Sequence, residues 1–276
     1  MSLTEPFQAE FMQRAFLEAC IVAVLGGVLG TWIVLRSLAF YAHAVGTATF
    51  PGLVLADAWA LPAQPVALAA ALVTALAIQA VGSARPRSPD VATALVLVAA
   101  LAAGVVLASD VYEAGAGVDR LLFGSLLAVS AGDIWISLAV AVVAAAVVLG
   151  ARRAWLAAGF DRDSVGSLGL GAPLYDALLM GVIALAVVAV LDAVGALLVG
   201  ALFVLPAAAA RLLSTSVRGM HGLAVLFALG EAVAGLWIAY HLDVPPGPAI
   251  ATLGGAVLLA AAGAARLRAP ALGAAA

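Results

Sequence analysis

Lysine is missing from this chain: all 12 basic residues among its 276 are arginines. Without lysine there is no phosphate-binding loop of the G-x-x-x-x-G-K-[ST] type, whose lysine ammonium contacts the nucleotide phosphates. A Schiff-base lysine is excluded for the same reason. We therefore expect that the chain does not hydrolyse ATP itself and is not an enzyme.

Charged residues and cysteine are also scarce. Only 10% of the residues are charged and the net charge is −3, so the chain offers no basic face for nucleic acid. Cys20 is the single cysteine, which excludes an internal disulfide and a zinc site built from several cysteines.

Apolar residues dominate what is present. They make up 66% of the chain, and the mean hydropathy is +1.21. A soluble domain has about 25% charged residues, so this chain has too little polar surface to cover a globule in water. Backbone groups in lipid must hydrogen-bond within their own segment, which favours helices. The sequence therefore predicts an all-α, polytopic transmembrane bundle that forms one domain over residues 1–276.

Stretches of about 20 mostly apolar residues have the length that crosses ~30 Å of hydrocarbon. Nine such spans are found, at 15–35, 38–61, 63–83, 91–109, 133–150, 173–191, 195–212, 220–240 and 246–265. The segment 113–132 is Gly-rich and mixed, so it forms either a short surface helix or a partly inserted one. A bundle of eight spans is the alternative to nine.

The arginines are distributed unevenly between the predicted turns. If the turn 84–90 faces the cytoplasm, alternation leaves only Arg14 and Arg120 on the opposite side. The cytoplasmic side then holds ten arginines, at 36, 85, 87, 152, 153, 162, 211, 218, 266 and 268. Positive residues concentrate on the cytoplasmic side of membrane proteins. We therefore predict an inner (plasma) membrane protein with its N-terminus outside and, with nine spans, its C-terminus in the cytoplasm.

Glycines recur in the first and seventh spans, for example at Gly27, Gly30 and Gly200. Small residues let helix backbones approach closely in lipid. We interpret these glycines as packing positions rather than as parts of a functional site.

The span 38–61 has the densest set of polar residues. His43 and Thr47 are four residues apart and share one helix face. Pro51 has no N–H, so the carbonyl of Thr47 loses its helical partner and the helix is expected to kink. Imidazole, hydroxyl and carbonyl then converge on a point that could hold a cation or a polar solute. The alternative is that His43 bonds a neighbouring carbonyl and the kink serves packing.

Acidic residues within the predicted spans include Glu18, Asp57 and Glu231. Glu231 is near the middle of the span 220–240 and has no charge partner in its own helix. Such a residue faces a protein interior or a water-filled cavity, or it is protonated. We predict that Glu231 lies on a translocation pathway. Asp57 is nearer the outer end of its span, where it either joins the pathway or reaches water, and Glu18, near a span end, is expected to snorkel or pack.

The loop 151–172 is polar and contains Asp161 and Asp163, either of which can cap a short helix. Val165, Leu168 and Leu170 then form an apolar edge. Such a helix serves as a docking element for a partner or as an ordinary amphipathic connector.

Five stretches carry a resemblance to a known family. They are GVLGTWIVLRSLAFYAHAVGTATFPGLVLA (27–56), LLFGSLLAVSAGDI (121–134), FDRDSVGSLGL (160–170), VGALLVGALFVLPAAAARLL (194–213) and YHLDVPPGPAI (240–250). In these stretches, and over most of its length, the chain resembles the permease subunits of ABC-type zinc and manganese importers. The resemblance implies a type II importer fold, similar to that of the vitamin B12 importer permease.

The resemblance also implies partners and a mechanism. It implies a second copy of the permease, two cytoplasmic ATP-binding subunits that hold ATP and Mg²⁺, and an extracytoplasmic solute-binding protein. It implies import by alternating access. Stretch 160–170 is similar to the family's coupling segment, so contact with the ATPase is expected at Asp161, Asp163, Leu168, Gly169 and Leu170.

One motif departs from the family pattern, which has Gly-Asp-Ala-x-Ser-His-Ala after the first arginine-containing turn. His43 and Thr47 stand where the family has the aspartate and the histidine of the metal path. Imidazole suits zinc and other transition metals, but a neutral site binds a divalent cation less strongly. We therefore expect His43, Thr47 and Glu231 to contact a divalent metal, with Glu231 restoring the missing charge. The alternatives are another small solute on the same architecture and an ion-coupled secondary carrier.

Overall fold

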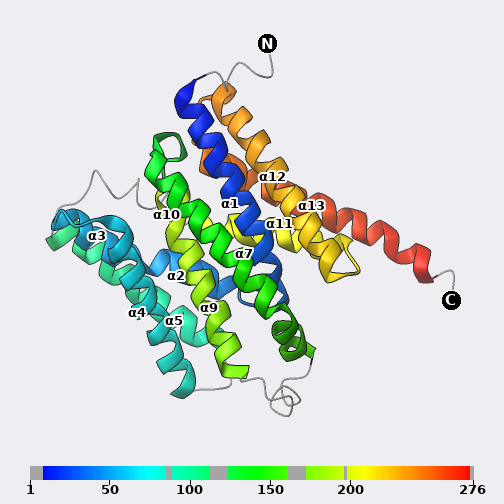
Figure 1. Cartoon of the computed structure of the whole chain (residues 1–276), viewed down its shortest axis with the longest axis horizontal. Coiled ribbons are helices and arrows are strands. Elements are labelled where there is room, and N and C mark those ends of the chain that lie inside the picture. The colour runs from blue at the N-terminus through cyan, green and yellow to red at the C-terminus, as the bar shows by residue number, and fades with distance from the viewer. Residues whose placement is uncertain (1–8, 85–88, 112–123, 161–171, 196–197, 274–276) are drawn as a thin grey trace.

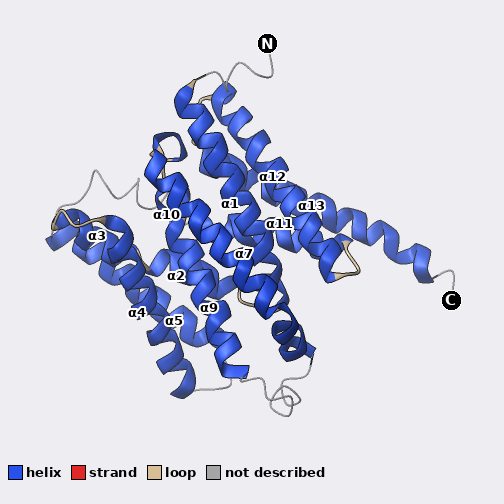
Figure 2. Ribbon diagram, viewed as in Figure 1, coloured by secondary structure: helices blue, strands red, loops and turns tan. Residues whose placement is uncertain are grey.

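The computed structural model describes residues 9–84, 89–111, 124–160, 172–195 and 198–273, and within these ranges the chain is helical with no strand (Figure 2). The helices are α1 Glu10–Leu35, α2 Ala39–Ala48, α3 Phe50–Ala58, α4 Ala63–Ala84, α5 Pro89–Val106, α7 Ala131–Phe160, α9 Ala172–Ala189, α10 Leu191–Val194, α11 Val199–Leu213, α12 Val217–Leu242 and α13 Pro246–Gly273. A π-helical turn, η2 (Leu107–Val111), extends α5, and a 3-10 turn, η3 (Leu126–Ala128), precedes α7.

The predicted spans correspond to helices of the structure. Seven described segments are long and apolar enough to cross a membrane, and α2 and α3 together count as one of them. The shorter apolar helices Leu174–Ala189 and Val199–Leu213 match the remaining two predicted spans. The all-α bundle is therefore confirmed, and each of the nine predicted spans overlaps a helical segment.

Helix α1 runs through the middle of the bundle (Figure 1). It packs against α7, α11 and α12, and α13 covers α11 and α12. Helices α2 to α5 pack together as a second group. Helix α9 contacts both this group and α7. Helix α2 contacts both α5 and α11, so the polar segment of the second span lies between the two groups of helices.

Glycines of α1 permit this central position. A Cβ atom on Gly27 would lie 2.7 Å from the Val225 backbone of α12, and one on Gly30 would lie 2.0 Å from the Phe203 carbonyl oxygen of α11. Real Cβ atoms do not approach so closely, so only glycine fits at these positions. The predicted packing role of these glycines is confirmed.

One end of the bundle is rich in arginine. The C-terminal ends of α1, α7 and α11 meet there with the N-terminal ends of α9 and α12; we call it the arginine-rich end. Arg211 of α11 donates a hydrogen bond to the carbonyl of Val34 at 3.1 Å, which brings the ends of α11 and α1 together. Arg36, Arg152 and Arg218 belong to the same end, whereas Arg14 lies near the start of α1, at the opposite end. This grouping agrees with the predicted arginine distribution.

Candidate functional site

The helix of the second span is interrupted at Thr49, between α2 and α3. Pro51, in the first turn of α3, has no N–H to donate to the carbonyl of Thr47. The Thr49 hydroxyl donates instead to the Gly46 carbonyl at 2.6 Å. The interruption predicted from Pro51 is therefore present, and its closing hydrogen bond comes from Thr49, for which we predicted no role.

His43 and Thr47 lie in the last turns of α2, before this interruption. Thr47 is buried and His43 is half-buried. A Cβ atom on Gly200 of α11 would lie 2.9 Å from the His43 Cβ and 3.1 Å from its Nδ1, so the imidazole packs against a glycine. The His43 ring has no hydrogen bond to any described residue. An imidazole with no partner among the described residues, beside an interrupted helix, is available to a ligand.

Glu231 lies in a different part of the bundle interior. Its side chain is 4% exposed and lines a cavity with Ala19 of α1, Leu202 of α11 and Ile250 of α13. Its Oε1 has no hydrogen-bond partner among the described residues. The cavity has about 20 Å³ for the centre of a water-sized sphere, which is room for one or two waters. Glu231 therefore faces a small cavity in the protein interior rather than lipid, which is among the alternatives that the sequence left open, and its pathway role stays a prediction.

Helix α11 separates Glu231 from His43. His43 lies against Gly200, whereas Glu231 lines its cavity together with Leu202. Successive residues of an α-helix are rotated by about 100°, so positions 200 and 202 project to nearly opposite sides of α11. The structure brings His43 and Thr47 together but not Glu231, and no group of three or more His, Cys, Asp or Glu side chains in the described ranges is placed to hold a metal ion.

Asp57 is exposed, in the last turn of α3. No described ion pair involves it, and it is apart from the His43–Thr47 segment by more than two helical turns along the chain. The exposed position agrees with the alternative in which Asp57 reaches water, and its pathway role stays a prediction.

Glu18 is a buried acid whose position the sequence did not reveal. Its side chain has 0% exposure, and Oε1 accepts a hydrogen bond from the Ser137 hydroxyl of α7 at 2.6 Å, while Oε2 has no described partner. Helix α1 begins at Glu10 rather than at the predicted residue 15, so Glu18 is more than two turns inside it and packs rather than snorkels. The available sequence signal was that Ala15 and Val22, three residues before and four residues after Glu18, are apolar and share its helix face.

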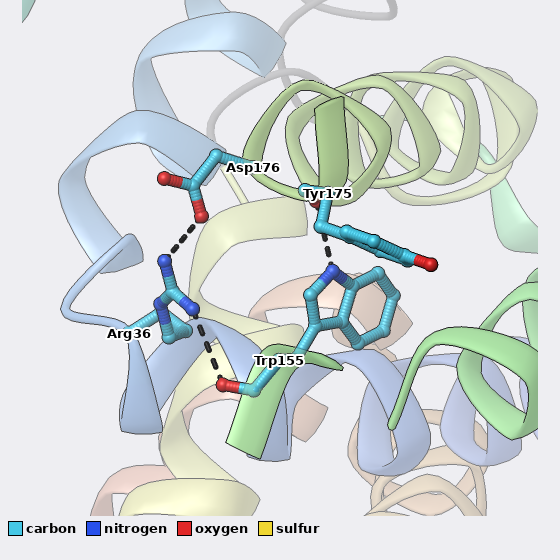
Figure 3. Close-up of polar contacts among 4 residues, drawn as sticks. All are labelled: Arg36, Trp155, Tyr175 and Asp176. Atoms are coloured by element: carbon cyan, nitrogen blue, oxygen red, sulfur yellow. Dashed lines mark hydrogen bonds and ion pairs between the residues drawn. The ribbon is translucent and has the colours of Figure 1, made fainter. Parts of the chain in front are cut away.

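Arg36 connects three helices at the arginine-rich end (Figure 3). It forms an ion pair with Asp176 of α9, and its Nη1 donates to the carbonyl of Trp155 in α7 at 3.3 Å. The Trp155 indole N–H in turn donates to the Tyr175 carbonyl at 2.8 Å. Because Arg36 lies in the turn before α2, this network joins the helices on both sides of segment 161–171 to the helix that carries His43. The predicted contact residues Asp161, Asp163, Leu168, Gly169 and Leu170 lie outside the described residues.

A cavity opens beside the same network. It has a volume of about 330 Å³ and is lined by Arg36, Tyr41, Asp90 and Asp176, among others. Tyr41 precedes His43 in α2, and its hydroxyl donates to the Met180 carbonyl of α9 at 3.2 Å. Asp176 is already paired with Arg36, so Asp90 is the carboxylate of this lining that attracts a cation.

Comparison with known proteins shows which family this chain belongs to. The family model described as the ABC 3 transport family matches residues 8–264 of the chain. This chain belongs to the ABC 3 transport family. Among its relatives in this family, the manganese transport system membrane protein MntC of Halalkalibacterium halodurans is 32% identical over 240 residues, which cover 87% of this chain and 82% of the relative. The manganese import system permease protein ScaB of Streptococcus gordonii is 29% identical, covering 87% of this chain and 86% of that one.

A solved structure shows the same fold as this ABC 3 family member. PsaBC from Streptococcus pneumoniae, solved in complex with Fab, has a chain that superposes with a TM-score of 0.82 at 27% identity and covers 92% of both chains. The family match spans nearly all of the described helices, from α1 into α13. The predicted membership in the ABC-type metal importer permeases is confirmed, and the chain is a multi-pass membrane protein.

Proposed function

We propose that this ABC 3 family member is the membrane-spanning permease subunit of an ATP-binding cassette importer that translocates a divalent transition metal of the manganese or zinc class. The observation that carries the proposal is the interrupted helix α2–α3, where the unbonded His43 imidazole lies inside the bundle against Gly200. The manganese transport proteins among its relatives support the cargo class.

The donor groups at the interruption favour a weak, transient metal site. His43 supplies an imidazole nitrogen, and Thr47 supplies a hydroxyl, but no carboxylate is beside them. Imidazole is a better ligand for zinc than for manganese, which prefers carboxylate and carbonyl oxygen. The ligand chemistry of this chain therefore favours zinc, whereas the named relatives carry manganese. Weak binding suits a translocation pathway, because the cargo must also leave the site.

The complete importer, on this proposal, contains a second copy of this chain, two cytoplasmic ATPase subunits that bind ATP and Mg²⁺, and an extracytoplasmic solute-binding protein. Alternating access opens the two copies to one side of the membrane and then to the other. The absence of lysine, and with it of a phosphate-binding loop, agrees with ATP hydrolysis on a separate subunit.

The Arg36 network is the proposed route from the ATPase to the pathway. Segment 160–170 contacts the ATPase, and the helices at its two ends are held to Arg36 through Trp155 and Asp176. A displacement of this segment therefore moves the turn that begins α2, and α2 carries His43. The Asp90 carboxylate, which unlike Asp176 is not paired with Arg36, attracts the released cation in the neighbouring cavity. In this arrangement the arginine-rich end and the C-terminus face the cytoplasm, and the N-terminus lies outside.

The experiment is uptake by proteoliposomes that contain this chain with its ATPase and a solute-binding protein, tested with manganese, zinc and other divalent metals. The proposal predicts uptake that requires ATP inside and is saturated by one of these metals. Uptake that needs ATP but ignores every metal favours a different small solute, a reading suggested by the changed motif at His43 and Thr47. Uptake by this chain without the ATPase would instead identify a secondary carrier.

A further inference from the structure

A groove between α1, α7 and α12 at the arginine-rich end is not used by the proposed pathway. Its volume is about 560 Å³, within the usual range for small-ligand sites. Arg152 and Arg153 of α7 and Arg218 of α12 line it, and Trp32 of α1 and His221 of α12 line it as well. The groove lies on the side of α1 that faces α7 and α12, whereas His43 lies on α2.

The charge of this groove is uncompensated within the described part of the chain. Three arginines line it and no aspartate or glutamate does. The ion pairs of the described residues are Arg14–Glu10 and Arg36–Asp176, so these three guanidinium groups have no carboxylate partner there. Several arginines converging without an acid form a site for an anion, because the planar guanidinium group binds phosphate through paired hydrogen bonds.

Two buried ring nitrogens add unsatisfied polar groups. Trp32 is 2% exposed and its indole N–H has no hydrogen-bond partner among the described residues. The Nδ1 of His221 contacts the Val217 carbonyl at 2.9 Å, so Nδ1 carries the hydrogen, and Nε2 has no described partner. In the neutral ring Nε2 is therefore an acceptor. Both nitrogens are buried, so the polar groups that the groove presents to a ligand are the three guanidinium groups.

The remaining wall is aliphatic, which distinguishes a lipid from a free anion. Val28 of α1 and Ala145, Val148 and Leu149 of α7 line the groove below the arginines. From Ala145 to Arg152 a helix rises about 10 Å, so the apolar wall continues along the bundle beyond the cationic mouth. Leu149 is 65% exposed, so an acyl chain can reach it. A free phosphate or an acidic protein segment would leave this wall unused.

We propose that this groove binds an anionic glycerophospholipid, with the phosphate at Arg152, Arg153 and Arg218 and the upper acyl chain along Ala145 and Leu149. Basic pockets between transmembrane helices have the chemistry that binds anionic headgroups. Phosphatidylglycerol is the test ligand, because its headgroup keeps the net negative charge of the phosphate that the three arginines would bind. The bound lipid would hold α1, α7 and α12 together near the C-terminal part of α7. This site is independent of the metal cargo.

Native mass spectrometry of the delipidated chain in neutral detergent tests the proposal. Phosphatidylglycerol and phosphatidylcholine of the same acyl chains are titrated against the wild type, Arg152→Gln/Arg153→Gln, and the control Arg266→Gln/Arg268→Gln, which removes the same charge from α13 outside the groove. At about fivefold per arginine, the α7 double variant should lose roughly 25-fold in phosphatidylglycerol affinity, and the α13 control should lose little. Wild type should prefer phosphatidylglycerol to phosphatidylcholine.

A second variant and a second ligand test whether the groove binds the acyl chain as well as the headgroup. Ala145→Phe fills the aliphatic part of the groove without changing charge, and it should also weaken phosphatidylglycerol binding. Glycerol phosphate, which has the headgroup chemistry without acyl chains, should not compete at equal concentration. Equal losses in both double variants, equal binding of the two lipids, or full competition by glycerol phosphate would each overturn the proposal. So would an Arg152→Gln/Arg153→Gln variant that binds lipid normally but no longer retains the ATPase, because the groove would then be a protein docking surface.

Discussion

Arg36, in the turn between α1 and α2, forms an ion pair with Asp176 in the first turns of α9, although the two residues are 140 positions apart. The side chains are only 12% and 23% exposed, so the pair is largely removed from water. It joins the helix that follows segment 161–171 to the helix that carries His43.

Asp176→Asn should therefore destabilise the protein and weaken coupling. Loss of a hydrogen-bonded, partly buried charge pair costs about 2 kcal/mol of unfolding free energy. Arg36→Lys, which keeps the charge but not both hydrogen bonds, should give an intermediate effect. The measurement is thermal unfolding in detergent, together with ATP hydrolysis per metal transported by the assembled complex.

Arg14→Gln is the matched control for this prediction. Arg14 pairs with Glu10 within α1, and these side chains are 44% and 78% exposed. An exposed pair contributes only about 0–1 kcal/mol, so its loss should change neither unfolding nor coupling. Equal effects of Arg14→Gln and Asp176→Asn would contradict a specific role for the Arg36 network.

Gly200→Ala should push α11 away from α2. Its methyl group would lie 2.9 Å from the His43 Cβ and 3.0 Å from the His43 Cα, and backbone cannot yield as a flexible side-chain tip does. We expect a loss of about 1–3 kcal/mol in stability and reduced transport. Gly230→Ala is the comparison, because nothing lies within 4 Å of a Cβ at that position of α12. That variant should be as stable as the wild type or more so, by up to about 1 kcal/mol from helix propensity.

Ser137→Ala should lower the stability of the protein, because it removes the hydroxyl that donates to the buried Glu18 carboxyl group. It removes the described hydrogen bond to a carboxyl group that is 0% exposed, at an expected cost of about 1–3 kcal/mol. In Glu18→Met/Ser137→Ala both polar partners are gone, and most of the stability should return. Unfolding measurements on the two single variants and the double variant form the cycle; additive losses would show that the pair does not interact.

Glu231→Gln tests whether the buried acid of α12 takes part in transport from its separate cavity. Glu231 does not meet His43 in this conformation, since α11 lies between them, so a contribution requires its charge to act during the cycle. We expect metal uptake to fall while the complex with the ATPase still assembles, as measured by co-purification and proteoliposome uptake. Unchanged uptake would remove Glu231 from the pathway.

Hydropathy alone was enough to place the helices, because about 20 apolar residues are needed to cross a bilayer wherever they occur in the chain. The proline at position 51 likewise predicted the interruption of the second span, since a missing N–H is a local property. The packing role of Gly27 and Gly30 was predictable for a similar reason, because the lack of a side chain is also a local property.

Contacts between distant residues were not available in that way. The pairing of Arg36 with Asp176 and of Glu18 with Ser137 depends on which helices become neighbours, which periodicity does not specify. The separation of Glu231 from His43 also depends on the position of α11. From the sequence, Glu231 and His43 were both predicted to be polar groups inside a bundle. The packing of α2, α11 and α12 determines that they occupy different sites.

The most direct measurement is metal uptake by the reconstituted importer with His43→Ala compared with His241→Ala. His241 is the control imidazole: it is stacked on Trp237 at the far end of α12, with its ring nitrogen against the Trp237 carbonyl at 2.9 Å. Both complexes should assemble and hydrolyse ATP. We predict that ATP-dependent uptake falls to background in His43→Ala and is unchanged in His241→Ala. Wild-type uptake by the His43→Ala complex would contradict the placement of the cargo at the α2–α3 interruption.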